Sequence, residues 1–157
     1  MSLPLTKEEV TAVAGRNADY YWTRWTPLNQ GQNWTSFNWA AFFLTGLWLA
    51  YRKMYKLALI FYVILILGVL ADHLNPDRKE SFGSTFGWII ALICGAGANR
   101  WYWSHATELV DEARAQNSSD VQTNDLFSRN GGTSVLSAVI FLVMFFALSF
   151  AIVSWVR

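Results

Sequence analysis

The sequence is poor in cysteine, histidine and charge. Cys94 is the single cysteine, so the chain cannot form an internal disulfide and its redox compartment cannot be read from cysteine usage. The two histidines, His73 and His105, lie on separate segments and with one cysteine do not make a zinc pattern. Basic and acidic residues nearly balance, at a net charge of +1, which gives no argument for a nucleic-acid partner. We expect no metal, no cofactor and no nucleic acid.

Motifs of catalysis and secretion are equally scarce. The sequence contains no nucleophile motif, phosphate-binding loop or dinucleotide fingerprint. Residues 1–9 lack the basic start and apolar stretch of a cleavable signal peptide, so insertion into a membrane would depend on internal helices. Asp72 and His73 end an apolar run and Asp77 follows; at such an edge water reaches them, so we interpret them as solvated groups and not as a proton relay or metal pair. We therefore expect no enzymatic activity.

Long apolar runs are what the chain has in abundance. Hydrophobic residues make up 54% of the sequence and aromatic residues 17%. Three runs are long enough to cross a hydrocarbon core of about 30 Å as helices, at residues 54–71, 82–98 and 133–156. The sequence predicts an all-α integral membrane protein with three transmembrane helices.

A fourth apolar block is too short to span comfortably. Thirteen uncharged residues, Trp39 to Tyr51, would form a helix of only about 20 Å. The block is rich in aromatic rings, which settle at the depth of the lipid headgroups. We interpret it as an interfacial or re-entrant aromatic helix; a tilted crossing that starts at Trp34 is the alternative. Labelling of a cysteine at Ser36 by a reagent on the periplasmic side would favour that alternative.

The polar segments complete the predicted organisation. Thr6 with Glu9 makes a capping box and Gly15 marks a helix end, so residues 1–36 form a cytoplasmic or interfacial arm with short helices. Residues 37–157 form the membrane domain. Its second span continues as an amphipathic extension over 99–115, and residues 115–132 read as a loop.

The distribution of basic residues predicts the orientation. With three spans and a non-crossing Trp39 block, nine of the twelve Lys and Arg residues fall on one side and three on the other. If the block crosses, the numbers become equal. The positive-inside rule then favours a multi-pass protein with a cytoplasmic N-terminus. The three residues on the far side are Arg78, Lys79 and Arg157.

Small residues recur at every fourth position of the second span. They form one helix face that lets another helix approach closely, and the last member can hydrogen-bond across the contact. The face would pack within the molecule or, alternatively, against a second copy or a partner. A leucine at this face would force the backbones apart. The predicted helix-packing residues are Gly83, Gly87, Ala91, Gly95 and Asn99.

Basic and aromatic residues gather at the start of the first span. They would anchor the protein on the cytoplasmic side, or recognise anionic lipid headgroups. The predicted interface and lipid-headgroup residues are Trp39, Trp48, Tyr51, Arg52, Lys53, Tyr55 and Lys56.

Four segments resemble one bacterial family. They are residues 17–21 (NADYY), 37–43 (FNWAAFF), 48–55 with the run YRKMY, and 99–102 (NRWY). Together they are similar to the domain-of-unknown-function family numbered 2628, small integral membrane proteins of bacteria. The resemblance covers roughly Ala14 to Val110 and leaves out the last span. It implies the bacterial inner (cytoplasmic) membrane and carries over no catalytic residue.

These observations favour a non-catalytic accessory or scaffold protein of the inner membrane. It would pack against itself, as a homo-oligomer, or against another membrane protein in a larger complex. It would also bind the interface of the lipid bilayer, with anionic lipids among its partners. An oligomeric conduit for a small solute or ion is the first alternative, for which Ser137, Ser149 and Ser154 give the only hint of a polar stripe. A lipid-associated membrane enzyme is the second.

Overall fold

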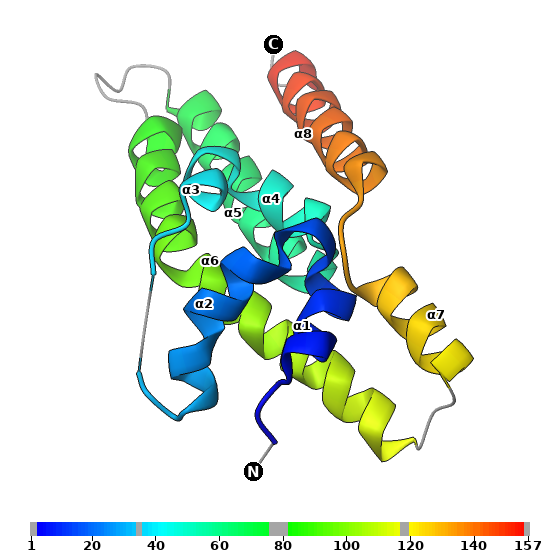
Figure 1. The fold of residues 1–157 in the computed structure, drawn as a ribbon. Helices are drawn as coiled ribbons and strands as arrows, with labels where there is room; N and C mark the ends of the chain where they lie inside the picture. Colours follow the sequence, from blue (N-terminus) through cyan, green and yellow to red (C-terminus); the bar gives the residue numbers. More distant parts are fainter. Residues whose placement is uncertain (1–2, 34–35, 76–81, 117–119, 156–157) are drawn as a thin grey trace. The chain divides into compact units, whose positions relative to one another are not determined.

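The described part of the chain is mainly helical. The computed structural model describes residues 3–33, 36–75, 82–116 and 120–155, and all its regular elements are helices, as the sequence predicts (Figure 1). They are α1 (Lys7–Ala14), the 3-10 turn η1 (Gly15–Asn17), α2 (Ala18–Asn29), α3 (Trp39–Leu44), α4 (Gly46–Tyr51), α5 (Tyr55–Leu74), α6 (Phe82–Ala115), α7 (Asp120–Asn130) and α8 (Val135–Trp155).

The chain forms two compact units. Unit 1 consists of Met1–Asn38 and Ala96–Thr133, and unit 2 of Trp39–Gly95 and Ser134–Arg157. The long helix α6 contributes residues to both. Residues 96–133 thus fold with the N-terminal segment, and the apolar helices α5 and α8 belong to unit 2.

In unit 1, helix α1 begins and ends where the sequence predicts. The Glu9 amide donates to Oγ1 of Thr6, and the Thr6 amide donates to Oε2 of Glu9 at 2.8 Å, which completes the capping box. Gly15 ends the helix at φ +62°, a conformation that L side chains rarely adopt. The buried face of α1 is formed by Val10, Val13 and Ala14.

Aromatic rings form the centre of unit 1. Tyr21 lies 4.9 Å from Trp25 and from Tyr102, and Trp25 lies 5.2 Å from Tyr102, measured between ring centroids. The Tyr102 hydroxyl donates to the backbone oxygen of Val13 at 3.2 Å. This cluster fixes α2 and the second half of α6 in one core, because buried aromatic pairs add attraction to their apolar area.

The segment predicted as a loop over 115–132 contains a helix. Eleven residues, DVQTNDLFSRN, form α7, so the prediction of a loop is wrong there. The segment is polar and shows no strong apolar stripe, so periodicity did not reveal it. Phe127 anchors the helix as a buried side chain, and Arg129 pairs with Asp125 at 3.0 Å one turn earlier.

In unit 2, helices α5 and α8 run in the same direction. The Tyr55 hydroxyl lies 2.8 Å from Oγ of Ser137, and further along both helices the Tyr62 ring lies 6.0 Å from the rings of Phe141 and Phe145. Residue numbers therefore rise together along the contact. The Ser134 amide donates to the Tyr51 oxygen at 2.7 Å, which places the start of α8 beside the end of α4.

Helix α6 begins against the end of α5. The Gly83 amide donates to Oδ2 of Asp72 at 2.8 Å, so a carboxylate from α5 caps the first turn of α6. A Cβ built on Gly68 would meet the Cα of Gly83 at 3.2 Å. The two backbones are close because neither residue has a side chain.

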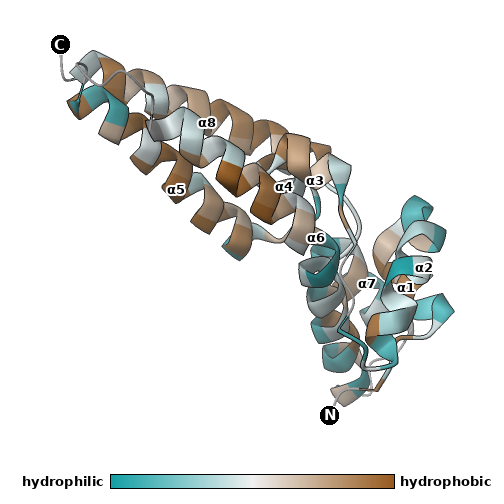
Figure 2. Ribbon diagram, turned by 90° about the vertical axis from the view of Figure 1, so that its left-hand side faces the viewer, coloured by the Kyte–Doolittle hydropathy of each residue, from teal (hydrophilic) through white to brown (hydrophobic). Residues whose placement is uncertain are grey.

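Two helices are long and apolar enough to cross a membrane. One is Tyr55–Leu74 and the other falls within Val121–Trp155, whose apolar part is α8. Figure 2 shows α5 and α8 in the brown of hydrophobic residues, whereas α1 and α2 carry much teal. Few of their residues are buried, unlike those of the core helix of a soluble protein, which points to association with a membrane. Residues 82–98, predicted as a third span, lie in helix α6. Among the described residues this helix is not counted as long and apolar enough to cross a membrane, so the third span stays a prediction.

Candidate functional site

The short apolar block of the sequence folds as two helices with a break between them. Helices α3 and α4 have six residues each and meet at Thr45. Thr45 has φ 44° and ψ −118°, a backbone conformation that a β-branched residue rarely adopts. Gly46 follows, and its Cβ position faces Phe61 and the backbone oxygen of Ala58 on α5 at 3.9 and 3.8 Å. The break thus lies against α5 beyond its first turn.

A pocket of about 210 Å³ opens at this break. The mouth carries exposed apolar side chains, including Phe43, Leu44 and Phe146, and the buried lining includes Tyr62. The complete lining is Phe43, Leu44, Thr45, Gly46, Leu47, Ala58, Tyr62, Leu65, Phe141, Leu142, Phe145 and Phe146. Helices α3, α4, α5 and α8 all contribute, so unit 2 alone builds this pocket.

One polar group in this lining stands out. Tyr62 is 8% exposed, and its hydroxyl oxygen has no hydrogen-bond partner among the residues that the structure describes. A buried hydroxyl without a partner is costly, so it calls for an explanation. Strained backbone such as that of Thr45 also tends to collect at ligand sites. The pocket is therefore the candidate functional site.

The predicted basic and aromatic interface residues do not share one environment. Trp39, Tyr55 and Lys56 are exposed, whereas Trp48 and Arg52 are buried, Arg52 at 1% exposure. The Arg52 guanidinium carbon lies 5.7 Å from the centroid of the Tyr51 ring. Tyr51 and Lys53 are half-buried, and burial lowers the pKa of the Lys53 ammonium below its ordinary value.

The predicted helix-packing face of α6 also divides. Gly83 lies against Gly68, while Ala91 and Gly95 are buried. Gly87 is half-exposed, and a Cβ added there would meet nothing within 4 Å. Close approach of another helix within the molecule is therefore seen at Gly83 and not at Gly87.

Asn99, the last residue of that face, is the centre of a buried polar network in unit 1. Its Oδ1 accepts from Nδ2 of Asn38 at 2.8 Å, and its Nδ2 donates to the hydroxyl of Ser36 at 2.8 Å. Its backbone oxygen accepts from the Trp25 indole at 3.0 Å, and its Nδ2 also lies 3.4 Å from the Tyr20 hydroxyl. Both ends of the amide are satisfied, so the network holds α2 and the segment before α3 on α6.

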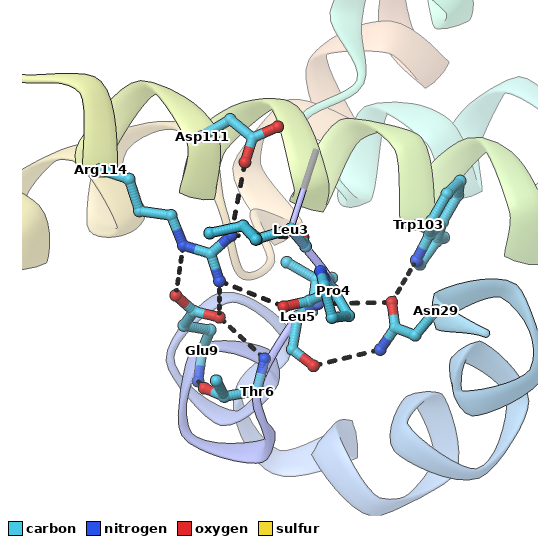
Figure 3. A network of polar contacts seen from close by, with 9 residues as sticks. All are labelled: Leu3, Pro4, Leu5, Thr6, Glu9, Asn29, Trp103, Asp111 and Arg114. Carbon is cyan, nitrogen blue, oxygen red and sulfur yellow. Dashed lines mark hydrogen bonds and ion pairs between the residues drawn. The ribbon is translucent and has the colours of Figure 1, made fainter. Parts of the chain in front are cut away.

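A second network fixes the N-terminus on the end of α6 (Figure 3). Arg114 holds Glu9 with two parallel bonds, Nε to Oε1 at 3.0 Å and Nη2 to Oε2 at 2.7 Å. The same guanidinium donates to the backbone oxygens of Leu3 and Pro4 and pairs with Asp111 at 3.5 Å.

Asn29 extends this network. Its Oδ1 accepts from the Trp103 indole at 3.0 Å, and its Nδ2 donates to the Leu5 oxygen at 3.1 Å. Both networks bind elements of one unit and serve its packing.

The cysteine, histidine and acidic side chains are dispersed. Cys94 is buried and free, and Nε2 of His105 lies 3.0 Å from the Asn130 oxygen. Among the described residues, no group of three or more His, Cys, Asp or Glu could hold a metal ion. Some residues named in the sequence predictions lie outside the described residues, namely Asp77, Arg78, Lys79, residue 156 and Arg157.

Thr45 and Tyr62 are the residues that sequence reasoning missed. The Thr45-Gly46 pair was a local signal for a helix break, since both residues are poor helix formers. Tyr62 gives no such signal, because it lies inside an apolar run and its partners on α8 are about eighty residues away in the sequence.

Comparison with known proteins identifies the family and nothing more specific. Neither a curated protein nor a solved structure shows significant similarity to the chain. Residues 7–107, well over half of the chain, match one family, and they include α3, α4, α5 and most of α6 but not α8. The chain belongs to the family described as "Protein of unknown function (DUF2628)".

Proposed function

We propose that the protein is a non-catalytic accessory or scaffold subunit of the bacterial inner membrane. Unit 2 lies in the bilayer as a multi-pass domain, and unit 1 lies on the cytoplasmic side with the N-terminus. The spans fall at α5, the first half of α6 and α8, while α3 and α4 enter the bilayer from the cytoplasmic side without crossing it.

One observation carries the proposal, namely the apolar surface of α8. None of the described residues of this helix is buried, although it consists of twenty-one mostly apolar residues. Three of the most exposed side chains, Leu136, Val143 and Phe150, recur at seven-residue spacing and so share a face. Lipid covers such a face in a monomer, and a helix of a second copy or of another membrane protein covers it in a complex.

The direction of the helices supports the proposed topology. Helices α5 and α8 run parallel, as they must if both leave the cytoplasmic side. Helix α6 returns from the end of α5, where Asp72 and Gly68 meet Gly83. The exposed Tyr55 and Lys56 at the start of α5 suit contact with headgroups, anionic ones included.

Cysteine cross-linking in native membranes tests the proposal. In a Cys94→Ala background, Val143→Cys places a thiol on the shared face of α8, and Leu67→Cys places one on the exposed side of α5. We expect a cross-linked product for Val143→Cys of defined mass, a dimer or a complex with one membrane protein. After extraction in mild detergent, the same assembly should exceed the mass of a single chain by light scattering.

Comparison of Val143→Cys with Leu67→Cys distinguishes a specific contact from random collision. Random collision would cross-link both positions equally. A monomeric mass together with equal cross-linking would contradict the scaffold proposal.

A further inference from the structure

The pocket at the break between α3 and α4 has a composition suited to one kind of guest. Its volume is about 210 Å³, and an engineered apolar cavity of about 150 Å³ is enough to hold benzene. Five of the twelve lining residues are Phe or Tyr. The space therefore accommodates an apolar body of about one ring, or an equal length of chain, with room at the mouth for more.

The Tyr62 hydroxyl adds a polar requirement. It is buried, its side chain lines the pocket, and no described residue accepts or donates a hydrogen bond to it. A phenol is a better donor than acceptor, so the group that satisfies it best is an uncharged oxygen acceptor, a carbonyl above all. A charged group would lose its hydration in this lining without an opposite charge to pair with it.

The access route also selects an apolar guest. The residues at the mouth that are most exposed, Phe43 at 71% and Phe146 at 64%, are both hydrophobic. Such a mouth admits a molecule that is dissolved among apolar surroundings and does not attract a water-soluble one.

We propose that this pocket binds an apolar chain or ring through one uncharged carbonyl oxygen, which accepts a hydrogen bond from Tyr62. Such binding goes beyond the scaffold role and rests only on the proposed placement of unit 2 in the bilayer. Two sources offer this chemistry, the acyl ester of a bilayer lipid and a free membrane-soluble ketone or quinone.

Benzophenone is a suitable probe for the purified full-length protein in detergent. It carries one carbonyl between two rings, and ultraviolet light attaches it to nearby C–H bonds. We expect saturable labelling that maps by mass spectrometry to lining residues such as Leu65 and Leu142. Diphenylmethane, which has the same rings without the carbonyl, should compete more weakly.

Two variants test the two halves of the recognition. Tyr62→Phe removes only the hydroxyl, and we expect benzophenone to bind about three- to tenfold more weakly, which is the contribution of one neutral hydrogen bond. Competition by diphenylmethane should not change. Leu65→Trp fills the space and should abolish labelling there.

Leu67→Trp is the control for the second variant, because it adds the same side chain on an exposed position of the same helix. Size-exclusion profiles and thermal midpoints show whether each variant keeps its fold.

Vesicles distinguish the two sources. If a lipid ester is the natural guest, benzophenone labelling is suppressed in dioleoylphosphatidylcholine and not in the dioleyl ether analogue, which has no carbonyl. If a free ketone is the guest, neither lipid competes, and 2-undecanone does. Labelling outside the pocket, or labelling that is equal in wild type, Tyr62→Phe and Leu65→Trp, would overturn the proposal.

Discussion

In unit 2, Thr45 and Arg52 have a backbone conformation and a buried charge that local sequence does not explain. Thr45 has positive φ at the break between α3 and α4, and Arg52 is a cation with 1% of its surface exposed. Each feature costs free energy unless its surroundings compensate. Substituting each residue therefore shows whether its surroundings compensate for this cost in free energy.

Thr45→Gly should raise the stability of the protein. Glycine adopts φ 44° without the strain that a β-branched side chain suffers. The relief of this strain exceeds the stability that glycine loses because it has more conformational entropy in the unfolded chain. We expect about 1 kcal/mol, or roughly 2–4 °C in thermal midpoint for a chain of this size. Thr23→Gly, on an exposed helical position of α2, should lower the midpoint instead. Equal losses in both variants would show that Thr45 is not strained.

Arg52→Ala should lower stability far more than Lys56→Ala. Removing Arg52 leaves space and unsatisfied surroundings in the interior of unit 2, at a cost of about 2–3 kcal/mol. Lys56 is exposed, and its loss should stay within about 0.5 kcal/mol. Thermal unfolding in one detergent measures both. Similar midpoints for the two variants would mean that Arg52 is solvated in solution.

At the scale of elements, two helix contacts differ in how much room they leave. The backbones of α5 and α6 nearly touch at Gly68 and Gly83, whereas Gly87 has open space beside it. Gly68→Ala should therefore destabilise the protein, because its methyl group must push a backbone away. Gly87→Ala should be neutral or stabilising, since alanine favours the helix. Thermal midpoints of the two variants test this, and equal effects would place another helix beside Gly87.

The docking of α1 depends on one guanidinium. Arg114 makes a two-bonded pair with Glu9 and reaches two backbone oxygens, and both side chains are largely shielded, at 28% and 23% exposure. Arg114→Gln should therefore speed hydrogen exchange at the amides of Val10 and Val13 while α5 exchanges as before. Arg129→Gln removes an ion pair that is 75% and 54% exposed and should leave α1 unchanged. Unchanged exchange in Arg114→Gln would mean that apolar packing alone holds α1.

The sequence predicts elements well where the signal is local and poorly where it is not. Apolar runs at 54–71 and 133–156 become α5 (Tyr55–Leu74) and α8 (Val135–Trp155), because a helix of apolar residues is visible in any short window. The capping box at Thr6 is equally local. Helix α7 is not predicted because most of its side chains are polar and form no apolar stripe. The pocket needs residues of α3, α4, α5 and α8 together, and no short window of the sequence contains them.

At the scale of the whole chain, the proposed topology predicts which ends of the helices face the cytoplasm. In a Cys94→Ala background, Thr11→Cys and Gln116→Cys report on unit 1, and Asn75→Cys reports on the end of α5; all three positions are exposed. We expect a membrane-impermeant thiol reagent to label only Asn75→Cys in cells whose outer membrane is permeabilised. Lysed cells should show labelling at all three positions.

Ser36→Cys decides how α3 and α4 enter the bilayer. A chain that dips in and returns keeps residue 36 on the same side as Lys53, so the same reagent should fail to reach it in cells with an intact inner membrane. Labelling of Ser36→Cys together with Asn75→Cys would mean that the block crosses. The number of crossings would then rise to four, and the positive-inside argument would fail.

The parallel course of α5 and α8 has a consequence for the order of synthesis. The Tyr55–Ser137 contact joins residues 82 positions apart, so the ribosome completes α5 long before α8 exists to cover it. During that interval the walls formed by α3, α4 and α5 are present while Phe141 and Phe145 are not. Contacts of such long range form late, and surfaces that await them are exposed to wrong partners. A nascent chain arrested before residue 135 should therefore bind insertion factors through α5. A chain arrested after α8 has emerged should no longer bind them.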